Sequence, residues 1–183
     1  MNRSIRYMTQ AAGIAAIYIL LTMPLITLPF GLRLSEAMTV LPALIPAAVP
    51  GLFIGCLIAN ILNPQNLGVI DIVLGSMTTL AAAWLTYHLS LRWPLRMDKG
   101  RSTSPLSPIR LLLVLWPAVV LNGLIVGTYL PFLIVGQTSS VSLAMVVTNI
   151  AILTIGEAAV IILVGIPLLL AFLRLKPRAE SFK

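Results

Sequence analysis

The sequence predicts an all-α integral membrane protein with six transmembrane helices and with both termini in the cytoplasm. Hydrophobic residues make up 59% of the 183 residues and charged residues only 9%, and the mean hydropathy is +1.04. Apolar runs long enough to span a bilayer recur along the chain. A soluble fold cannot cover so much apolar surface with so few charges. Residues 1–183 are therefore expected to form a single transmembrane domain in a lipid bilayer.

The third observation is the position of Lys and Arg, which membrane proteins concentrate on their cytoplasmic side. Apart from Arg33, these residues gather in three tracts: Arg3 and Arg6; Arg92, Arg96, Lys99, Arg101 and Arg110; and Arg174, Lys176, Arg178 and Lys183. All three tracts should face the same compartment, so an even number of spans must separate each tract from the next. The same distribution explains the net charge of +7 without a nucleic-acid partner.

The parity decides between two interpretations of residues 37–63. They form either one kinked span or two short helices that turn at Pro50-Gly51, and only two helices keep the number of crossings even. Proline removes a backbone donor and clashes inside a helix, which also favours a break. The expected spans are residues 8–30, 37–49, 51–63, 68–91, 109–135 and 143–173, with a cytoplasmic loop at residues 92–108.

Several function classes are disfavoured by what the sequence lacks. It contains one His, one Cys and no Gly-x-x-x-x-Gly-Lys phosphate loop. Nothing pairs a nucleophile with a base, so we expect neither an enzyme nor a cofactor or metal site. This chain is therefore not expected to bind ATP through such a loop.

The few acidic residues near the expected spans are the first candidates for a binding site. Glu157 lies near the middle of the last span, where an acid costs roughly 2.5–3.5 kcal/mol to insert and therefore faces a partner or a cavity. It either pairs with an Asn or Ser of a neighbouring helix or binds a substrate. Asp71 either caps its helix, where the positive dipole end favours an acid, or contacts a ligand. Arg33 and Glu36, in the first external loop, either pair with each other at the surface or join the site.

Asparagines add a second group of candidates, because an amide offers both donors and acceptors to a heterocycle. Asn60, Asn122 and Asn149 lie at or near membrane depth, where such side chains also join helices at about 0.6 kcal/mol per contact. A flat ligand would in addition need a stacking wall, for which Phe30, Tyr129 and Phe132 are candidates by position. The substrate-binding residues that we expect are Glu157, Glu36, Asn60, Asp71, Asn122 and Arg33.

Small residues on the first expected span form two overlapping pairs. Ala11 with Ala15, and Ala12 with Ala16, are each four residues apart, which lets another helix approach closely. Either pair could serve packing within the chain or contact with a partner protein.

An ordered series of motifs resembles the substrate-binding (S) components of energy-coupling factor (ECF) transporters, and among these the QueT-type queuosine-precursor transporters. The resemblance spans about residues 11 to 170. Its motifs are residues 33–42 (RLSEAMTVLP), 45–60 (IPAAVPGLFIGCLIAN), 71–76 (DIVLGS), 122–127 (NGLIVG) and Gly156-Glu157.

The resemblance implies a multi-pass protein of the bacterial plasma membrane that captures a small molecule outside the cell. Its implied partners are a transmembrane coupling protein, docked by one of the alanine pairs, and two ATPase subunits. The implied substrate is a 7-deazaguanine with a 7-cyano or 7-aminomethyl group. On this hypothesis Glu157 reads the guanine-like edge and Glu36 covers the ligand from the external loop. The alternatives are an S component for another vitamin or purine, and a structural membrane subunit that transports nothing.

Overall fold

The computed structural model describes residues 2–23, 33–64, 67–95, 107–135 and 140–175, and every regular element within these ranges is a helix. The elements are α1 (Arg3–Thr22), the 3₁₀ helix η3 (Leu34–Ala43), α2 (Ala48–Leu62), α3 (Val69–Arg92), α4 (Pro108–Leu121), the π-helical segment η4 (Asn122–Val126), α5 (Gly127–Val135), α6 (Leu143–Val160), the π-helical segment η6 (Ile161–Gly165) and α7 (Ile166–Leu175).

Large apolar side chains cover the outside of this bundle. Val69 is 74% exposed, Leu143 78% and Leu163 73%, which hydrocarbon tolerates and water does not. The stretches long and apolar enough to cross a membrane are Arg3–Thr22, Val69–Arg92, Pro108–Val135 and Leu143–Arg174, and Ala48–Leu62 is a shorter apolar helix. The predicted all-helical, multi-pass membrane protein is therefore confirmed, while the number of six crossings stays a prediction.

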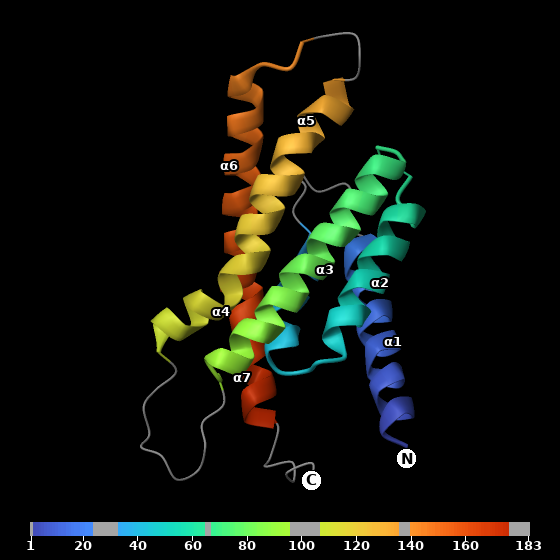
Figure 1. Cartoon of the computed structure of the whole chain (residues 1–183), viewed down its shortest axis with the longest axis vertical. Coiled ribbons are helices and arrows are strands. Elements are labelled where there is room, and N and C mark those ends of the chain that lie inside the picture. The colour runs from blue at the N-terminus through green and yellow to red at the C-terminus, as the bar shows by residue number, and fades with distance from the viewer. Residues whose placement is uncertain (1, 24–32, 65–66, 96–106, 136–139, 176–183) are drawn as a thin grey trace.

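The basic helix ends gather at one end of the molecule. In Figure 1 the start of α1, the end of α3, the start of α4 and the end of α7 all lie toward the bottom. Those ends carry Arg3, Arg92, Arg110 and Arg174, which represent all three basic tracts. This arrangement is the one on which the parity argument rests. Which compartment this end faces stays a prediction.

The break predicted at Pro50-Gly51 is wrong. The turn lies before residue 48, and both residues belong to the first turns of α2, Ala48–Leu62. A proline in the first turn of a helix removes only an N–H that has no partner within the helix, so Pro50 does not interrupt α2. The segments expected at 37–49 and 51–63 are therefore η3, Leu34–Ala43, followed by α2.

The limits of the longer spans agree better with the prediction. The expected spans 68–91, 109–135 and 143–173 end within one residue of the apolar helical stretches found. The first helix differs, because it begins at Arg3 rather than at residue 8. Asn2 caps this helix by accepting a hydrogen bond from the Ser4 backbone N–H at 3.4 Å. The end predicted for this span, at residue 30, lies outside the described residues.

The 3₁₀ helix η3 occupies the centre of the bundle. Residues 35–42 are all buried, and η3 contacts α1, α3, α7 and η6 among others. A Cβ placed on Gly165 of η6 would lie 2.9 Å from Val40 Cγ1. Because 3₁₀ runs longer than three or four residues are uncommon, the surrounding helices impose this conformation. The segment expected as an external loop thus lies inside the protein.

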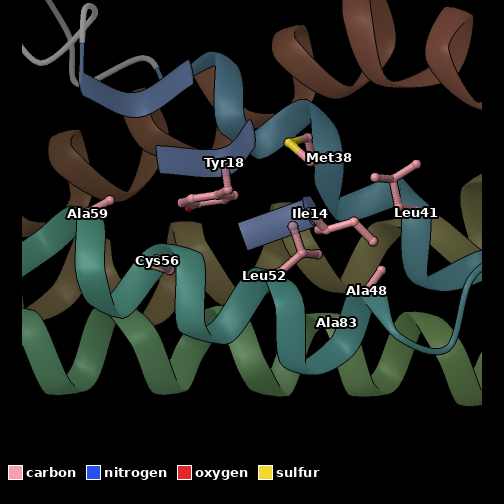
Figure 2. Packing of buried hydrophobic residues seen from close by; sticks show 9 residues of the cluster. All are labelled: Ile14, Tyr18, Met38, Leu41, Ala48, Leu52, Cys56, Ala59 and Ala83. Carbon is pink, nitrogen blue, oxygen red and sulfur yellow. The ribbon is translucent and has the colours of Figure 1, made fainter. Parts of the chain in front are cut away.

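A core of apolar side chains packs between α1, α2 and η3. Figure 2 shows Ile14 and Tyr18 of α1 facing Leu52 and Cys56 of α2, with Met38 of η3 nearby. A second core joins Val40 with residues of α3, α4 and α7. Together these cores bury η3 and fix the height of its polar residues in the bundle.

Pairs of glycines bring two sets of helices into close contact. In α2, a Cβ on Gly51 would lie 2.8 Å from the Ala11 carbonyl oxygen, and one on Gly55 would lie 2.9 Å from Tyr18 Cβ. We call this contact the α1–α2 seam. Each pair has the four-residue spacing that lets membrane helices approach closely.

The second contact, the α5–α6 seam, uses Gly123 and Gly127. A Cβ on Gly123 would collide with the Thr154 hydroxyl, and one on Gly127 would lie 2.8 Å from Ile150 Cα. Gly123 belongs to η4, and π-helical segments occur mostly as single turns inside α-helices, often at functional sites. Figure 1 shows α4 leaning away from the direction of α5 across this segment.

Candidate functional site

A cavity of about 520 Å³ lies among η3, α2, α3, α5 and α6. Small-molecule sites usually measure roughly 300–1,000 Å³, so the volume fits a compact metabolite. Every substrate-binding candidate from the sequence lines it: Arg33, Glu36, Asn60, Asp71, Asn122 and Glu157. The structure therefore brings together residues that are up to 124 positions apart, as Arg33 and Glu157 are. Their role in binding stays a prediction.

Glu36 enters the cavity from the buried 3₁₀ helix. Its side chain is 6% exposed, and its Oε1 accepts from the Tyr18 hydroxyl at 2.6 Å. Its Oε2 accepts from Asn122 Nδ2 at 3.5 Å, a long contact. The expectation that Glu36 belongs to an external loop is wrong, because apolar packing around η3 draws the segment into the bundle. Pairing with Arg33 at the surface is wrong for the same reason.

Glu157 is joined to Glu36 through one amide. Asn122 Nδ2 donates to Glu157 Oε1 at 3.1 Å and also contacts Glu36 Oε2. Asn122 begins η4, so the π-helical turn is the element that carries this amide into the cavity. The two readings of Glu157 therefore coincide, since it pairs with an Asn of a neighbouring helix and also lines the cavity.

The wall formed by α2 and α3 is contacted by Arg33. Its Nη1 donates to Asn60 Oδ1 at 3.0 Å, and Asn60 Nδ2 lies 3.5 Å from Cys56 Sγ. The Thr79 hydroxyl contacts the same sulfur at 3.3 Å. A guanidinium is always protonated and offers five donors, so Arg33 supplies a permanent positive charge at this wall.

Asp71 connects the cavity across α3 and α5. Its Oδ1 accepts from the Tyr129 hydroxyl at 2.9 Å, and its side chain is 8% exposed. Asp71 also lies in the first turn of α3, where the helix dipole favours a negative charge. Both readings of Asp71 thus describe its position. Next to it, a Cβ on Gly75 would lie 3.2 Å from Asn60 Nδ2 and 3.5 Å from the Tyr129 hydroxyl.

The aromatic wall expected for a flat ligand is found only in part. Tyr129 lines the cavity, whereas Phe132 is 54% exposed on the outside of α5. Phe132 is therefore wrong as a stacking residue, because it lies on the exposed side of its helix and does not line the cavity. Phe30 lies outside the described residues. Asn149 also lines the cavity, and its Nδ2 donates to the Gly127 carbonyl at 3.0 Å.

Two residues are absent from the sequence-based candidates, one that contacts a cavity residue and one that lines the cavity. Tyr18 supports Glu36 from α1, and Cys56, interpreted from the sequence only as a packing residue, also lines the cavity. An aromatic residue and a cysteine inside apolar runs look like core residues, and both are buried in the α1–α2 core. Cys56 could have been predicted from its spacing, because it lies four residues before Asn60 and therefore on the same face of a helix.

The structure separates the two alanine pairs of α1. Ala11 and Ala15 are 8% and 6% exposed, because they face Gly51 and Gly55 in the α1–α2 seam. Ala12 and Ala16 are exposed on the other side of α1. The first pair therefore serves packing within the chain, and only the second is open to another protein. Docking of a partner there stays a prediction.

The polar groups of the cavity offer both hydrogen-bond donors and acceptors. They combine three carboxyl groups and a guanidinium with asparagine amides, and in the described part of the chain no group of three or more His, Cys, Asp or Glu residues could hold a metal. Apolar helices around such a cavity define a multi-pass membrane protein with an internal cavity lined by charged and amide groups. The chain belongs to the QueT transporter family, whose model matches residues 8–174. It is therefore a transport protein. No curated protein and no solved structure matched the chain.

Proposed function

We propose that this chain is the substrate-binding S component of an ECF-type importer and that it captures a 7-deazaguanine precursor of queuosine outside the cell. The observation that carries the proposal is the convergence of acidic, basic and amide groups on one cavity, in a chain of the QueT transporter family. A purine-like base has donors and acceptors along one edge, so its recognition needs groups of both kinds.

The polar groups match this edge in chemistry. A guanine-like ring presents a ring N–H and an exocyclic amine side by side, and one carboxylate accepts both in strong, directional bonds. We assign this role to Glu157, with Glu36, Asn60, Asp71 and Asn122 as further contacts. Three carboxyl groups outnumber the single guanidinium of Arg33, which favours a ligand with a cationic 7-aminomethyl group.

The proposed topology has six crossings, with the basic helix ends and both termini in the cytoplasm of a bacterial cell. The passage through η3 counts as one crossing in this proposal, and its ten 3₁₀ residues extend about 20 Å of the roughly 30 Å of hydrocarbon. Asn63, Leu67 and Ile134 line the cavity near the end of α2, the start of α3 and the end of α5. These lie opposite the basic ends in Figure 1, so the cavity would receive its ligand from outside.

Energy would come from partner proteins in this proposal. A coupling protein would dock on the exposed Ala12/Ala16 face of α1, where small side chains allow a helix to approach closely. Two ATPase subunits would then supply the ATP hydrolysis. Ala16→Leu should abolish co-purification with the coupling protein and leave ligand affinity unchanged. Ile17→Leu, on the same exposed face, should change neither, and equal loss in both variants would contradict this docking site.

The substrate is tested by equilibrium binding to the full chain purified in detergent. We expect saturable binding of 7-aminomethyl-7-deazaguanine and weaker binding of the 7-cyano compound. Excess guanine and riboflavin should displace them poorly, because neither carries the 7-substituent. If another vitamin or purine competes more strongly, the substrate class is different. If folded protein binds none of these compounds, the proposed capture function is wrong.

A further inference from the structure

Tyr18 contacts the binding site without belonging to the wall of the cavity. Its side chain is fully buried on α1, and its hydroxyl donates to Glu36 Oε1 at 2.6 Å. Bonds from a hydroxyl to an ionised carboxylate measure about 2.5–2.7 Å and are roughly twice as strong as neutral ones. A carboxylate inside a membrane protein needs such donors, because no bulk water replaces them.

The position of this hydroxyl is set by helix packing. Tyr18 lies in the core formed with Ile14, Leu52 and Cys56, as Figure 2 shows. Gly55 lets α1 approach so closely that a Cβ there would lie 2.9 Å from Tyr18 Cβ. The ring therefore has little freedom to move, and the α1–α2 seam fixes the point at which its hydroxyl meets Glu36.

The two carboxylates that share Asn122 are consequently not equivalent. Glu36 accepts at both oxygens, from Tyr18 at Oε1 and from Asn122 at Oε2. Glu157 accepts from Asn122 at Oε1, and in the described part of the structure no donor contacts its Oε2. Glu157 is also more exposed than Glu36. Of these two carboxylates, Glu157 is the one with an oxygen that receives no hydrogen bond from the described residues, and this oxygen is available to a second N–H of a ligand.

We infer that Tyr18 is a positioning residue of the binding site. By holding Glu36 Oε1, it fixes the orientation of the Glu36 carboxylate, so that Glu36 meets the base through Oε2, which has only the 3.5 Å contact with Asn122, and the paired N–H groups of the base are left to Glu157. The inference rests on the proposed function, which it deepens by assigning different tasks to the two acids. It also makes α1, which lines no part of the cavity with its own side chains among the described residues, a determinant of affinity.

The test is a double-mutant cycle on binding of 7-aminomethyl-7-deazaguanine to the full chain. Tyr18→Phe should lower affinity about tenfold, which is the worth of a hydrogen bond to a charged group. In a Glu36→Gln background the same change should have no further effect, because the carboxylate it positions is gone. Tyr7→Phe, at a 44% exposed position on the same helix, is the matched control and should leave affinity unchanged.

A ligand analogue separates the two acids. Removing the exocyclic amine of the base, as in the 7-deazahypoxanthine analogue, should weaken binding to the wild type, to Tyr18→Phe and to Glu36→Gln. It should cost nothing in Glu157→Gln, where the acceptor for that amine is already lost. If the penalty instead disappears in Glu36→Gln, the assignment of tasks is overturned.

The remaining outcomes are also decisive. An unchanged affinity in Tyr18→Phe, or an equal loss in both backgrounds, means that Tyr18 serves only the general packing, and the inference is wrong. If Tyr18→Phe does not fold, Gly55→Ala keeps the hydroxyl but crowds Tyr18, and its affinity loss should likewise vanish with Glu36→Gln. Should the wild type bind no deazaguanine, the proposed function fails first, and the inference fails with it.

Discussion

The α1–α2 seam and the α5–α6 seam use the same local device with different results. Both bring helices together through two glycines four residues apart. In α2, however, seven of the 15 residues are buried, whereas Val160 is the one buried residue among the 18 of α6. The difference teaches that α2 is buried on several faces, while most of α6 is only partly buried or exposed. Glu36 therefore belongs to the more buried side of the site, and Glu157 to the less buried side.

The largest expected effect is at Glu157, on the less buried side. Glu157→Gln should lower the affinity for 7-aminomethyl-7-deazaguanine about a hundredfold, because an amide replaces one acceptor by a donor that opposes the N–H groups of the base. Isothermal titration of the full chain measures the change. Glu36→Gln should cost less, since it loses a single contact. A larger loss at Glu36 than at Glu157 would reverse the comparison.

The seams themselves can be compared by adding one methyl group to each. Gly55→Ala and Gly127→Ala should each destabilise the protein by about 1–3 kcal/mol, because the new Cβ meets a Cβ or a Cα at less than 3.0 Å. Thermal unfolding in detergent measures this. Gly13→Ala is the control, since nothing lies within 4 Å of its Cβ, and it should be neutral or slightly stabilising.

These two variants should differ in their effect on binding. Gly55→Ala displaces Tyr18 and should lower both the affinity for the ligand and the stability of the protein. Gly127→Ala should lower stability with a smaller loss of affinity. Equal ratios of affinity loss to stability loss in the two variants would mean that the seams do not differ in their connection to the site.

A smaller effect is expected where the two sides meet, between Asp71 and Tyr129. Tyr129→Phe removes the hydroxyl that joins α3 to α5 and should weaken binding about tenfold at most, as expected for a bond to a carboxylate. Equilibrium binding and the melting temperature should be measured together. A lower melting temperature with unchanged affinity would show that this contact only holds the helices together.

The smallest effect is expected at Gly75, which lines the cavity close to Asn60 and Tyr129. Gly75→Ala adds a methyl group 3.2 Å from Asn60 Nδ2, which Asn60 can avoid by a shift of a few tenths of an ångström. We expect about a threefold loss of affinity, on the order of 0.7 kcal/mol. The affinity for the smaller base guanine, measured by competition, should decrease less than the affinity for the 7-substituted compound. Equal losses would indicate that the methyl group disturbs α3 generally.

The sequence predicted the long helices well and the centre poorly, for physical reasons. Apolar runs bounded by Arg92 and Arg174 have sharp ends, because a charge does not enter hydrocarbon readily. The prolines of residues 42–50 did not define where the helices end, because Pro50 is compatible with the first turn of a helix as well as with a break. The burial of η3 depends on contacts from four or more other helices, which no local pattern contains.

The candidate site was predictable in its members but not in its connections. Buried acids and amides are costly, so Glu157, Asn122 and their neighbours could be expected in one cavity. Tyr18 could not, because an aromatic residue in an apolar span has the same signature whether it packs or donates a bond. Likewise, Gly51 and Gly55 of α2 decide which alanine pair of α1 is buried and which is exposed, and the sequence of α1 does not contain this information.

The shortness of η3 has a consequence for how the protein is made. Its ten residues are fewer than the about 20 apolar residues that a spanning helix needs, so we do not expect the insertion machinery to recognise η3 as a span by itself. In the proposed topology the segment would enter the membrane as the helices around it assemble. Substitutions in η3 should accordingly reduce the amount of protein in the membrane, through degradation of unassembled chains, before they alter any property of the protein that survives.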